Sequence, residues 1–407
     1  MEEEKECEGR VDRNAFIHMA YLRGDAKECL SLIEEQLRET KGLSEYPLYM
    51  KAVVLREEGR VQEALSLFQA ATCMAPTNPS NLKQVARCLF LLGKHKAAID
   101  VYNEAQRVQD QDDWEVWHNK GLCYKKLKQF EKAVDCLEQA NCISRHDATY
   151  MALGNVYEEQ GNLEAALETY RDALDDAPEN TELLTTIGLL YLRLGDKENA
   201  FTHLGNSLTH NPRDPKTILA AGSIIQDNND VEVALVKYRV AAVHAPNCPH
   251  LWSNAGMCFY GNKRYIAAIA CLKRALYLDP FEWIICYNLG LVHLATKQYA
   301  SAFQYLSSSI NLKPDYAPSY MHLGVALAHL DDFDNACSAY EKALELEADH
   351  VTHLNYAVTL FNNDEPELAA EQFQQHEQLL AIAKEDPDFE MDEDVDIQRR
   401  LLRDAGL

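Results

Sequence analysis

The sequence contains no hydrophobic run long enough to cross a membrane. Its most apolar stretches, such as IGLLYL and ILAAGSII, end at a charged or polar residue after fewer than ten residues, whereas a membrane-spanning helix needs about 20. The chain also starts with the acidic segment MEEEKECEGR and not with an apolar signal segment. These absences predict a protein without direct membrane insertion that resides in the cytoplasm with reduced thiols.

Basic residues are scarce relative to acidic ones. The chain has 39 lysines and arginines against 64 aspartates and glutamates, which gives a formal net charge of -25 at pH 7. A surface of this sign repels phosphate backbones and anionic lipid head groups. We therefore expect no nucleic-acid partner.

Motifs for catalysis, cofactors and metals are missing. The sequence has no GxxxxGK, no GxGxxG after a strand, no GxSxG, no HExxH and no CxxC, and these are patterns that cradle phosphates, present nucleophiles or bind metals. His350 and His353 lie three residues apart, but a histidine pair alone is a poor metal site. The sequence predicts no enzyme activity, no cofactor and no metal site.

Glycine recurs at an unbroken spacing of 34 residues through the middle of the chain, and an alanine follows each glycine twelve residues later. The glycines are Gly154, Gly188, Gly222, Gly256, Gly290 and Gly324, and the alanines are Ala166, Ala200, Ala234, Ala268, Ala302 and Ala336. A ladder of prolines, Pro178, Pro212, Pro246, Pro280 and Pro314, keeps the same step. This period is typical of tetratricopeptide repeats, each a hairpin of two helices.

The two small residues occupy positions 8 and 20 of the repeat, where we expect the two helices to approach most closely. A bulky side chain there would overpack the joint by about 1 to 3 kcal/mol. The proline ends the second helix, because it cannot continue a helix and disfavours helical geometry in the residue before it. The small residues are therefore predicted to be structural.

Extended outward, the frame predicts eleven repeats that form one elongated domain over residues 10–383. They begin near residues 10, 45, 79, 114, 147, 181, 215, 249, 283, 317 and 350. The spacing slips to 35 residues between 79 and 114, and to 33 residues at the 114–147 and 317–350 joints. The predicted fold class is all-α, a right-handed superhelical solenoid of about eleven tetratricopeptide hairpins.

The two ends of the chain differ from the repeats. We expect residues 1–9 to be a disordered acidic N-terminus, and residues 384–407 to be an acidic tail. In that tail, eight of the twelve residues from Glu385 to Asp396 are acidic, a run that repels itself. Ile397, Leu401 and Leu402, with interspersed arginines, predict a short amphipathic terminal helix, either a docking segment or a frayed end.

Positions 2, 5, 6, 9 and 13 of each repeat are expected to line a concave surface that binds partners. Position 6 carries a polar series in five repeats: Asn119, Asn254, Asn288, His322 and Asn355. An asparagine amide both donates and accepts hydrogen bonds, so this series could bind the backbone of an extended peptide. The alternative is that asparagine simply suits a half-exposed helical position.

A second candidate site is basic. Lys83 and Arg87 occupy positions 5 and 9 of the third repeat, and Lys125, Lys126 and Lys128 lie at the end of the next first helix. Together they could hold an acidic segment of a partner. The alternative is that these side chains are only solvated. Arg87 stands where the carboxylate clamp of chaperone-binding tetratricopeptide proteins uses asparagine, and Glu115 stands where it uses lysine, so capture of chaperone tails is not expected.

The residues between the repeat signatures carry a more specific likeness. Segments such as NLKQVARCLFLLGKHKAAIDVYNEA, ENTELLTTIGLLYLRLG and MCFYGNKRYIAAIACLKRA resemble the Bardet-Biedl syndrome protein four family, which are tetratricopeptide subunits of the BBSome. The likeness runs from about residue 14 to 375. It departs at the end of the chain, where members of the family carry a long Ser- and Pro-rich extension.

The resemblance implies a non-enzymatic scaffold subunit of a coat-like adaptor complex that moves membrane proteins to and from cilia. Its implied partners are BBSome subunits that bear beta-propellers, a second tetratricopeptide subunit and a small extended subunit, together with centriolar satellite and dynein-linked proteins. The implied locations are the cilium base, the ciliary shaft and centriolar satellites.

Two alternatives from other functional classes remain open at this point. One is a tetratricopeptide scaffold subunit of another large assembly, such as the anaphase-promoting ubiquitin ligase, whose subunits dimerise through their N-terminal repeats. The other is a sugar-transferring enzyme that carries such repeats. That enzyme would need a glycosyltransferase domain after residue 383, and the length of the chain argues against it.

Overall fold

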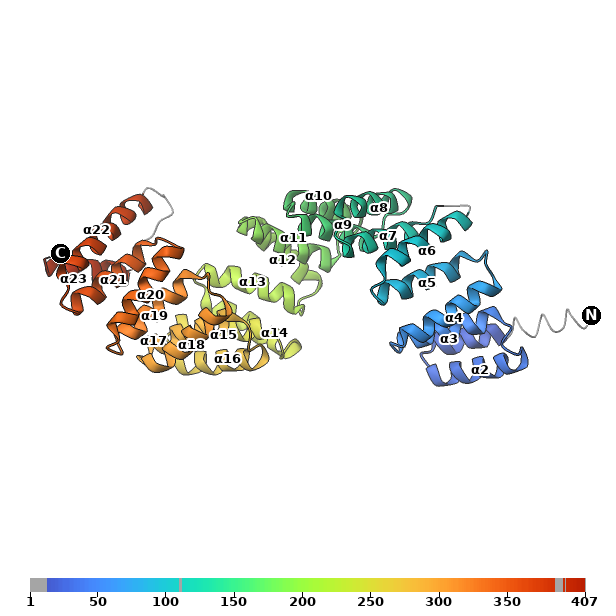
Figure 1. Ribbon diagram of the computed structural model, residues 1–407, viewed down its shortest axis with the longest axis horizontal. Helices are drawn as coiled ribbons and strands as arrows, with labels where there is room; N and C mark the ends of the chain where they lie inside the picture. Colours follow the sequence, from blue (N-terminus) through green and yellow to red (C-terminus); the bar gives the residue numbers. More distant parts are fainter. Residues whose placement is uncertain (1–12, 110–111, 385–390, 392, 407) are drawn as a thin grey trace, which may run out of the picture. The chain divides into compact units, whose positions relative to one another are not determined.

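The computed structural model describes residues 13–109, 112–384, 391 and 393–406, and all regular secondary structure in these residues is helical (Figure 1). The predicted all-α fold is confirmed for this part of the chain. The predicted disordered segment 1–9 lies outside the described residues, as do residues 385–390 and 392 of the acidic run. The chain divides into two compact units, one up to His203 and one from Leu204, and the boundary falls inside a helix.

The first unit consists of helix pairs in chain order. Its helices are residues 13–22, α2 (Ala26–Glu39), α3 (Glu45–Glu57), α4 (Val61–Met74), α5 (Pro79–Leu91), α6 (His95–Val108), α7 (Trp114–Lys126), α8 (Phe130–Ile143), α9 (Asp147–Gln160), α10 (Leu163–Asp176), α11 (Thr181–Arg193) and the start of α12 (Lys197–His210).

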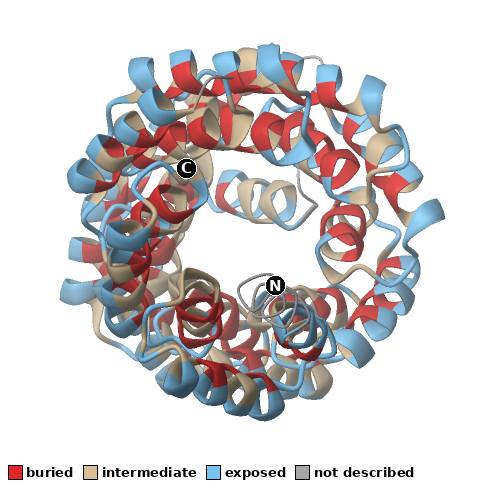
Figure 2. Cartoon of the chain, turned by 90° about the vertical axis from the view of Figure 1, so that its right-hand side faces the viewer, coloured by how far each residue is buried: buried red, intermediate tan, exposed pale blue. Residues whose placement is uncertain are grey.

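The second unit repeats the same arrangement and ends with one additional helix. Its helices are the rest of α12, α13 (Pro215–Asp227), α14 (Val231–His244), α15 (Pro249–Gly261), α16 (Tyr265–Leu278), α17 (Trp283–Ala295), α18 (Tyr299–Leu312), α19 (Ala317–Ala328), α20 (Phe333–Leu346), α21 (His350–Asn362), α22 (Pro366–Ala383) and α23 (Glu393–Asp404). In both units the helices carry buried residues on one side and exposed residues on another (Figure 2).

In six hairpins, the glycine at position 8 packs against a large side chain of the second helix. A Cβ atom added at Gly154 would lie 2.3 Å from Cζ of Tyr170, and one added at Gly290 would lie 2.6 Å from Cγ of Leu306. The carbonyl oxygen of the position-20 alanine is also close, because a Cβ at Gly256 would lie 3.3 Å from the oxygen of Ala268. At these glycines a larger residue would force the two helices apart.

A left-handed residue ends the first helix of every hairpin, a feature that the sequence reasoning did not anticipate. In the first unit these residues are Gly24, Gly59, Gly93, Lys128, Gly161 and Gly195, and in the second they are Asn229, Lys263, Lys297, Asp331 and Asp364. The residue after the left-handed one donates a backbone hydrogen bond to the carbonyl oxygen five residues earlier, as in a Schellman motif. For example, the N–H of Asn162 donates to the oxygen of Tyr157 at 3.0 Å. The second unit therefore makes these turns without the residue that favours them.

The connections between repeats absorb the slips in spacing. Residues 177–180 join α10 to α11, whereas the shorter stretches 144–146 and 347–349 join α8 to α9 and α20 to α21. Residues before the ladder prolines leave helical geometry, as at Ala245 with φ -130° and ψ 65°. At the two short joints, which have no ladder proline, Ser144 and Glu347 are fully extended, with ψ 127° and 120°.

Candidate functional site

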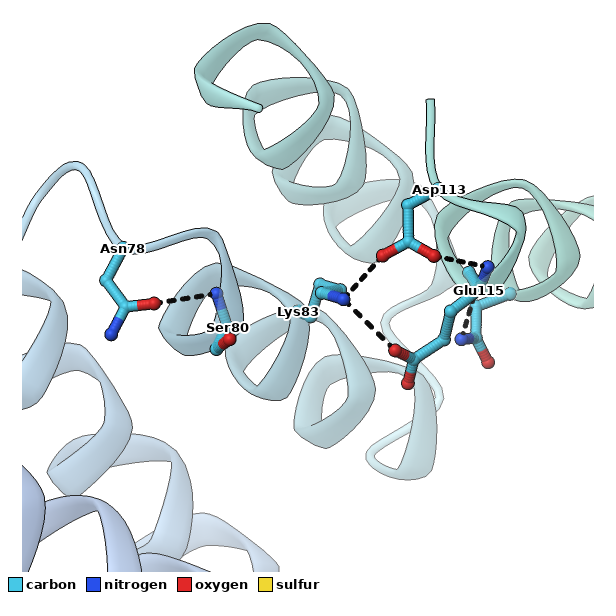
Figure 3. Close-up of polar contacts among 6 residues, drawn as sticks. Asn78, Ser80, Lys83, Asp113 and Glu115 are labelled. Atoms are coloured by element: carbon cyan, nitrogen blue, oxygen red, sulfur yellow. Dashed lines mark hydrogen bonds and ion pairs between the residues drawn. The ribbon is translucent and has the colours of Figure 1, made fainter. Parts of the chain in front are cut away.

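The basic candidate site of the first unit is already paired within the chain. Lys83 of α5 donates hydrogen bonds to Asp113 at 2.5 Å and to Glu115 at 3.1 Å (Figure 3). Asp113 also caps α7, because its Oδ1 accepts from the backbone N–H of Glu115 at 2.9 Å. One carboxylate thus starts the helix of the fourth repeat and ties it to the third.

The charge of Lys83 is stabilised by this pairing. Burial acts to lower the pKa of Lys83, but the hydrogen bonds to Asp113 and Glu115 outweigh burial and hold the pKa above its ordinary value. The same contacts hold the pKa of Asp113 below its ordinary value against the opposing effect of burial. Lys83 therefore remains protonated, and its positive charge is balanced by Asp113 and Glu115. It is poorly placed to hold a partner's acidic segment by itself.

Arg87 lies one helical turn beyond Lys83 and is exposed. The structure therefore separates the two predicted basic residues into an internal ion pair and a solvent-facing guanidinium. Arg87 occupies position 9, one of the positions predicted to line the concave surface. Of the three predicted lysines at the end of α7, Lys125 lies 3.2 Å from Glu159, whereas Lys126 and Lys128 are exposed. Arg87, Lys126 and Lys128 therefore remain of the basic candidate.

The polar series at position 6 connects neighbouring repeats in the second unit. Asn288 of α17 is buried, and its Nδ2 donates to Oγ of Ser253 in α15 at 3.2 Å. Asn355 of α21 likewise directs its Nδ2 toward the sulfur of Met321 in α19, at 3.2 Å. Each contact joins position 6 of one repeat to position 5 of the repeat before it.

His322 follows the same rule. Its Nδ1 lies 2.8 Å from the carbonyl oxygen of Pro318 and 3.4 Å from the hydroxyl of Tyr287, which is position 5 of the preceding repeat. Burial lowers the pKa of His322, while the contact with Pro318 opposes that shift. The side chain is therefore neutral at pH 7 and sits inside the wall of the solenoid.

The other two members of the series lie apart from these contacts. In the first unit the Nδ2 of Asn119 donates to the backbone oxygen of Glu115 at 2.8 Å, within its own helix. Asn254 of α15 is half-buried. The structure thus brings Asn288, His322 and Asn355 into contacts between repeats, and binding of a peptide backbone by the series stays a prediction.

Two clefts lie at the two joints where the repeat spacing is 33 residues. The first, about 520 Å³, lies among α8, α9 and α10, and Glu138, Tyr157, Glu168 and Asp172 line it. The second, about 350 Å³, lies among α19, α20, α21 and α23. The sequence shows the shorter spacing at both pairs of repeats, but it does not show that a cleft lies there.

Residues 13–109, 112–384, 391 and 393–406 contain no group of three histidine, cysteine, aspartate or glutamate side chains arranged to hold a metal ion. None of the helices in these ranges is both long and apolar enough to cross a membrane. The described cysteines that share position 10 of the repeat, Cys88, Cys123 and Cys258, are buried. Burial raises the pKa of the Cys258 thiol to about 11, which makes it an unreactive packing residue.

Comparison with known proteins supports the repeat assignment. Family models described as "Tetratricopeptide repeat" match residues 55–117, 114–140, 249–282, 267–317 and 317–350, and one described as "TPR repeat" matches residues 154–195. The prediction of tetratricopeptide hairpins is therefore confirmed over both units.

Two mammalian proteins are similar to nearly the whole chain. The "BBSome complex member BBS4" of Mus musculus is 52% identical over 384 residues, which cover 94% of this chain and 74% of the mouse protein. The protein of the same name from Bos taurus is 51% identical over 391 residues, covering 96% of this chain and 75% of its own length. Identity at this level extends well beyond the repeat signatures.

A solved structure with the same fold is the "APC/C hetero-tetramer Cut9-Hcn1". Its chain superimposes with a TM-score of 0.52, covers 95% of this chain and 94% of its own length, and is 15% identical in sequence. At this identity the likeness concerns the fold alone. It confirms the all-α solenoid that the repeat period predicts.

Proposed function

We propose, from the premise that this chain belongs to the BBS4 family of BBSome complex members, that it is a non-enzymatic scaffold subunit of the BBSome. In that role it helps a coat-like adaptor carry membrane proteins to and from cilia. The observation that supports this proposal is the 52% identity over 94% of the chain. A shared fold accounts for glycines and alanines at packing positions, but it does not account for identity in the variable residues between them.

The proposed partners are the other BBSome subunits, among them beta-propeller-bearing subunits, a second tetratricopeptide subunit and a small extended subunit. Centriolar satellite and dynein-linked proteins are further proposed partners. The proposed locations are the cytoplasm, the cilium base, the ciliary shaft and centriolar satellites. An open helical surface with exposed polar residues and no metal cluster in its described part suits a scaffold better than a catalyst.

The proposed binding surfaces are the concave face and the ends of the repeat array. Arg87 is the exposed member of the predicted basic pair on the concave face, so it is the residue with which to test that face. A charge reversal at an interface arginine that contacts a partner weakens binding by at least about tenfold. Arg107 of α6, also exposed but on the second helix of its hairpin, offers a matched control.

The experiment is affinity purification of the tagged chain from ciliated cells, with quantification of stoichiometric partners. We expect BBSome subunits to co-purify with the wild-type chain, to decrease with Arg87→Glu and to persist with Arg107→Glu. Recovery of anaphase-promoting complex subunits in place of BBSome subunits would refute the proposed function. Equal recovery with Arg87→Glu and Arg107→Glu would refute only the role of Arg87.

A folding variant completes the test. A Cβ at Gly256 would lie 2.8 Å from Cγ of Leu272, so Gly256→Leu is expected to unfold its hairpin and its neighbours. The variant chain should therefore leave the complex. Far-UV circular dichroism of the purified variant separates this loss of structure from loss of a contact surface.

A further inference from the structure

The terminal helix α23 is docked by a face different from the one that its sequence suggests. Leu402 is 5% exposed and packs with Leu354, Ala357 and Phe373 of α21 and α22. Ile397 and Leu401, which the sequence pattern places with Leu402 on one apolar face, are 53% and 62% exposed. The buried face instead runs through Val395 and Leu402, two helical turns apart.

An ion-pair cluster holds the same face. Arg399 donates from Nε to Oε1 of Glu377 at 2.5 Å and from Nη2 to Oε2 at 2.8 Å. Arg403 donates to Oε2 of the same carboxylate at 2.8 Å. The hydrogen bonds from Arg399 are the main cause that holds the pKa of Glu377 below its usual value. Two arginines thus converge on one acidic residue of α22 with fork geometry.

The helix lies on positions that the repeat frame assigns to the concave surface. Gln398 lines the 350 Å³ cleft together with residues at positions 9 and 13 of the tenth repeat, Val325 and His329, and with Asn355 at position 6 of the eleventh. Gln398 therefore places the middle of α23 at this cleft.

Little of the apolar surface in the described part of α23 is buried. Among the described residues of the helix, Leu402 is the one that is buried, and Ile397 and Leu401 remain exposed. Such a small interface is sufficient for a tethered segment, because the tether gives an effective concentration on the order of millimolar. A helix on another chain that contacts more of the groove can compete with it.

We propose that the groove of α19, α21 and α22, in which Glu377 of α22 lies, is a docking site for an amphipathic helix of a partner subunit, and that α23 fills this site in cis. The partner helix that fits carries apolar residues seven apart, with one arginine four residues after the first and another directly after the second, as in Val395, Arg399, Leu402 and Arg403. This inference rests on the proposed function, because it specifies which kind of partner segment the proposed concave binding surface recognises.

The test uses the purified full chain and a fluorescent peptide of residues 391–407. In the chain, Leu402→Asp with Arg399→Glu removes the apolar contact of Leu402 and the hydrogen bonds of Arg399, which opens the groove. We expect the opened chain to bind the wild-type peptide at least about tenfold more tightly than the wild-type chain does, measured by fluorescence anisotropy, because the tethered competitor is lost. Arg399→Glu with Arg403→Glu is a second opened chain that leaves the apolar contacts unchanged.

Matched peptides define the face that docks. A peptide with Leu402→Asp should lose binding, whereas one with Ile397→Asp should retain it, since Ile397 faces solvent. In a chain opened by Leu402→Asp with Arg399→Ala and Arg403→Ala, Glu377→Arg should weaken binding of the wild-type peptide, and a peptide with Arg399→Glu and Arg403→Glu should recover affinity for that chain.

Two results would overturn the inference. One is equally weak peptide binding by the wild-type chain and both opened chains, which would make α23 only a cap on the last hairpin. The other is the same loss of binding with Ile397→Asp as with Leu402→Asp. Because the assay contains no other subunit, either result leaves membership of the complex to be decided by co-purification.

Discussion

Replacing Gly154 by alanine is expected to destabilise the first unit, whereas the same replacement at Gly205 is expected to stabilise the second. Both glycines lie inside helices, α9 and α12. A Cβ at Gly154 would meet Cζ of Tyr170 at 2.3 Å, while a Cβ at Gly205 would have no atom within 4 Å. The two substitutions are chemically identical and differ only in the space that surrounds them.

The magnitudes follow from these distances. Ordinary contacts of a Cβ begin near 3.4 Å, so Tyr170 would have to move by about 1.1 Å. Its ring is fully buried, and its hydroxyl donates to Glu158 at 3.0 Å, which places the cost at the upper end of overpacking, about 3 kcal/mol. Alanine regains about 1 kcal/mol of helix propensity at either site. The net change is a loss of about 2 kcal/mol at Gly154 and a gain of about 1 kcal/mol at Gly205.

Thermal unfolding followed by circular dichroism at 222 nm measures both changes. For a unit of about 200 residues, 1 kcal/mol shifts Tm by about 2–4 °C. Gly154→Ala should therefore lower Tm by about 4–8 °C, and Gly205→Ala should raise it by about 2–4 °C. Adding Tyr170→Leu to Gly154→Ala should recover part of the loss, because a Cβ opposite leucine, as at Gly256, would lie 2.8 Å from the leucine and not 2.3 Å from a tyrosine ring. An unchanged or higher Tm for Gly154→Ala would refute the close contact inferred at position 8.

Two further predictions concern the turns and the histidines. Lys263 has φ 56°, a left-handed conformation that glycine adopts without strain. Lys263→Gly should stabilise the second unit by about 0.5–1 kcal/mol in urea unfolding, because the relief of strain exceeds the entropy that glycine adds to the unfolded chain. A lower urea midpoint for the variant would contradict this. Burial lowers the pKa of His322 and His376, so the unfolded chain binds more protons below about pH 6.5. Stability should fall as the pH drops from 7 to 5, and His322→Gln should reduce that fall; an equal fall in the variant would contradict the assignment.

The sequence by itself determined the repeat and its steric origin. Glycine and alanine recur every 34 residues because each hairpin must bring two helices into contact at the same two positions, and this requirement is local to one repeat. The slips in spacing were also visible in the sequence, and they fall in the connections between helices. Position 6 could be recognised as polar, although not as a link between repeats.

Tertiary structure alone decided which polar residues meet. Lys83 and its partners Asp113 and Glu115 are 30 and 32 residues apart, so no local pattern shows that the predicted basic site is neutralised. Asn288 meets Ser253 across 35 residues for the same reason. The face by which α23 docks was likewise beyond the sequence, because it depends on the position of Glu377 on a separate helix. Spacing within one hairpin is encoded locally, whereas contacts between hairpins depend on how each repeat is rotated against the next.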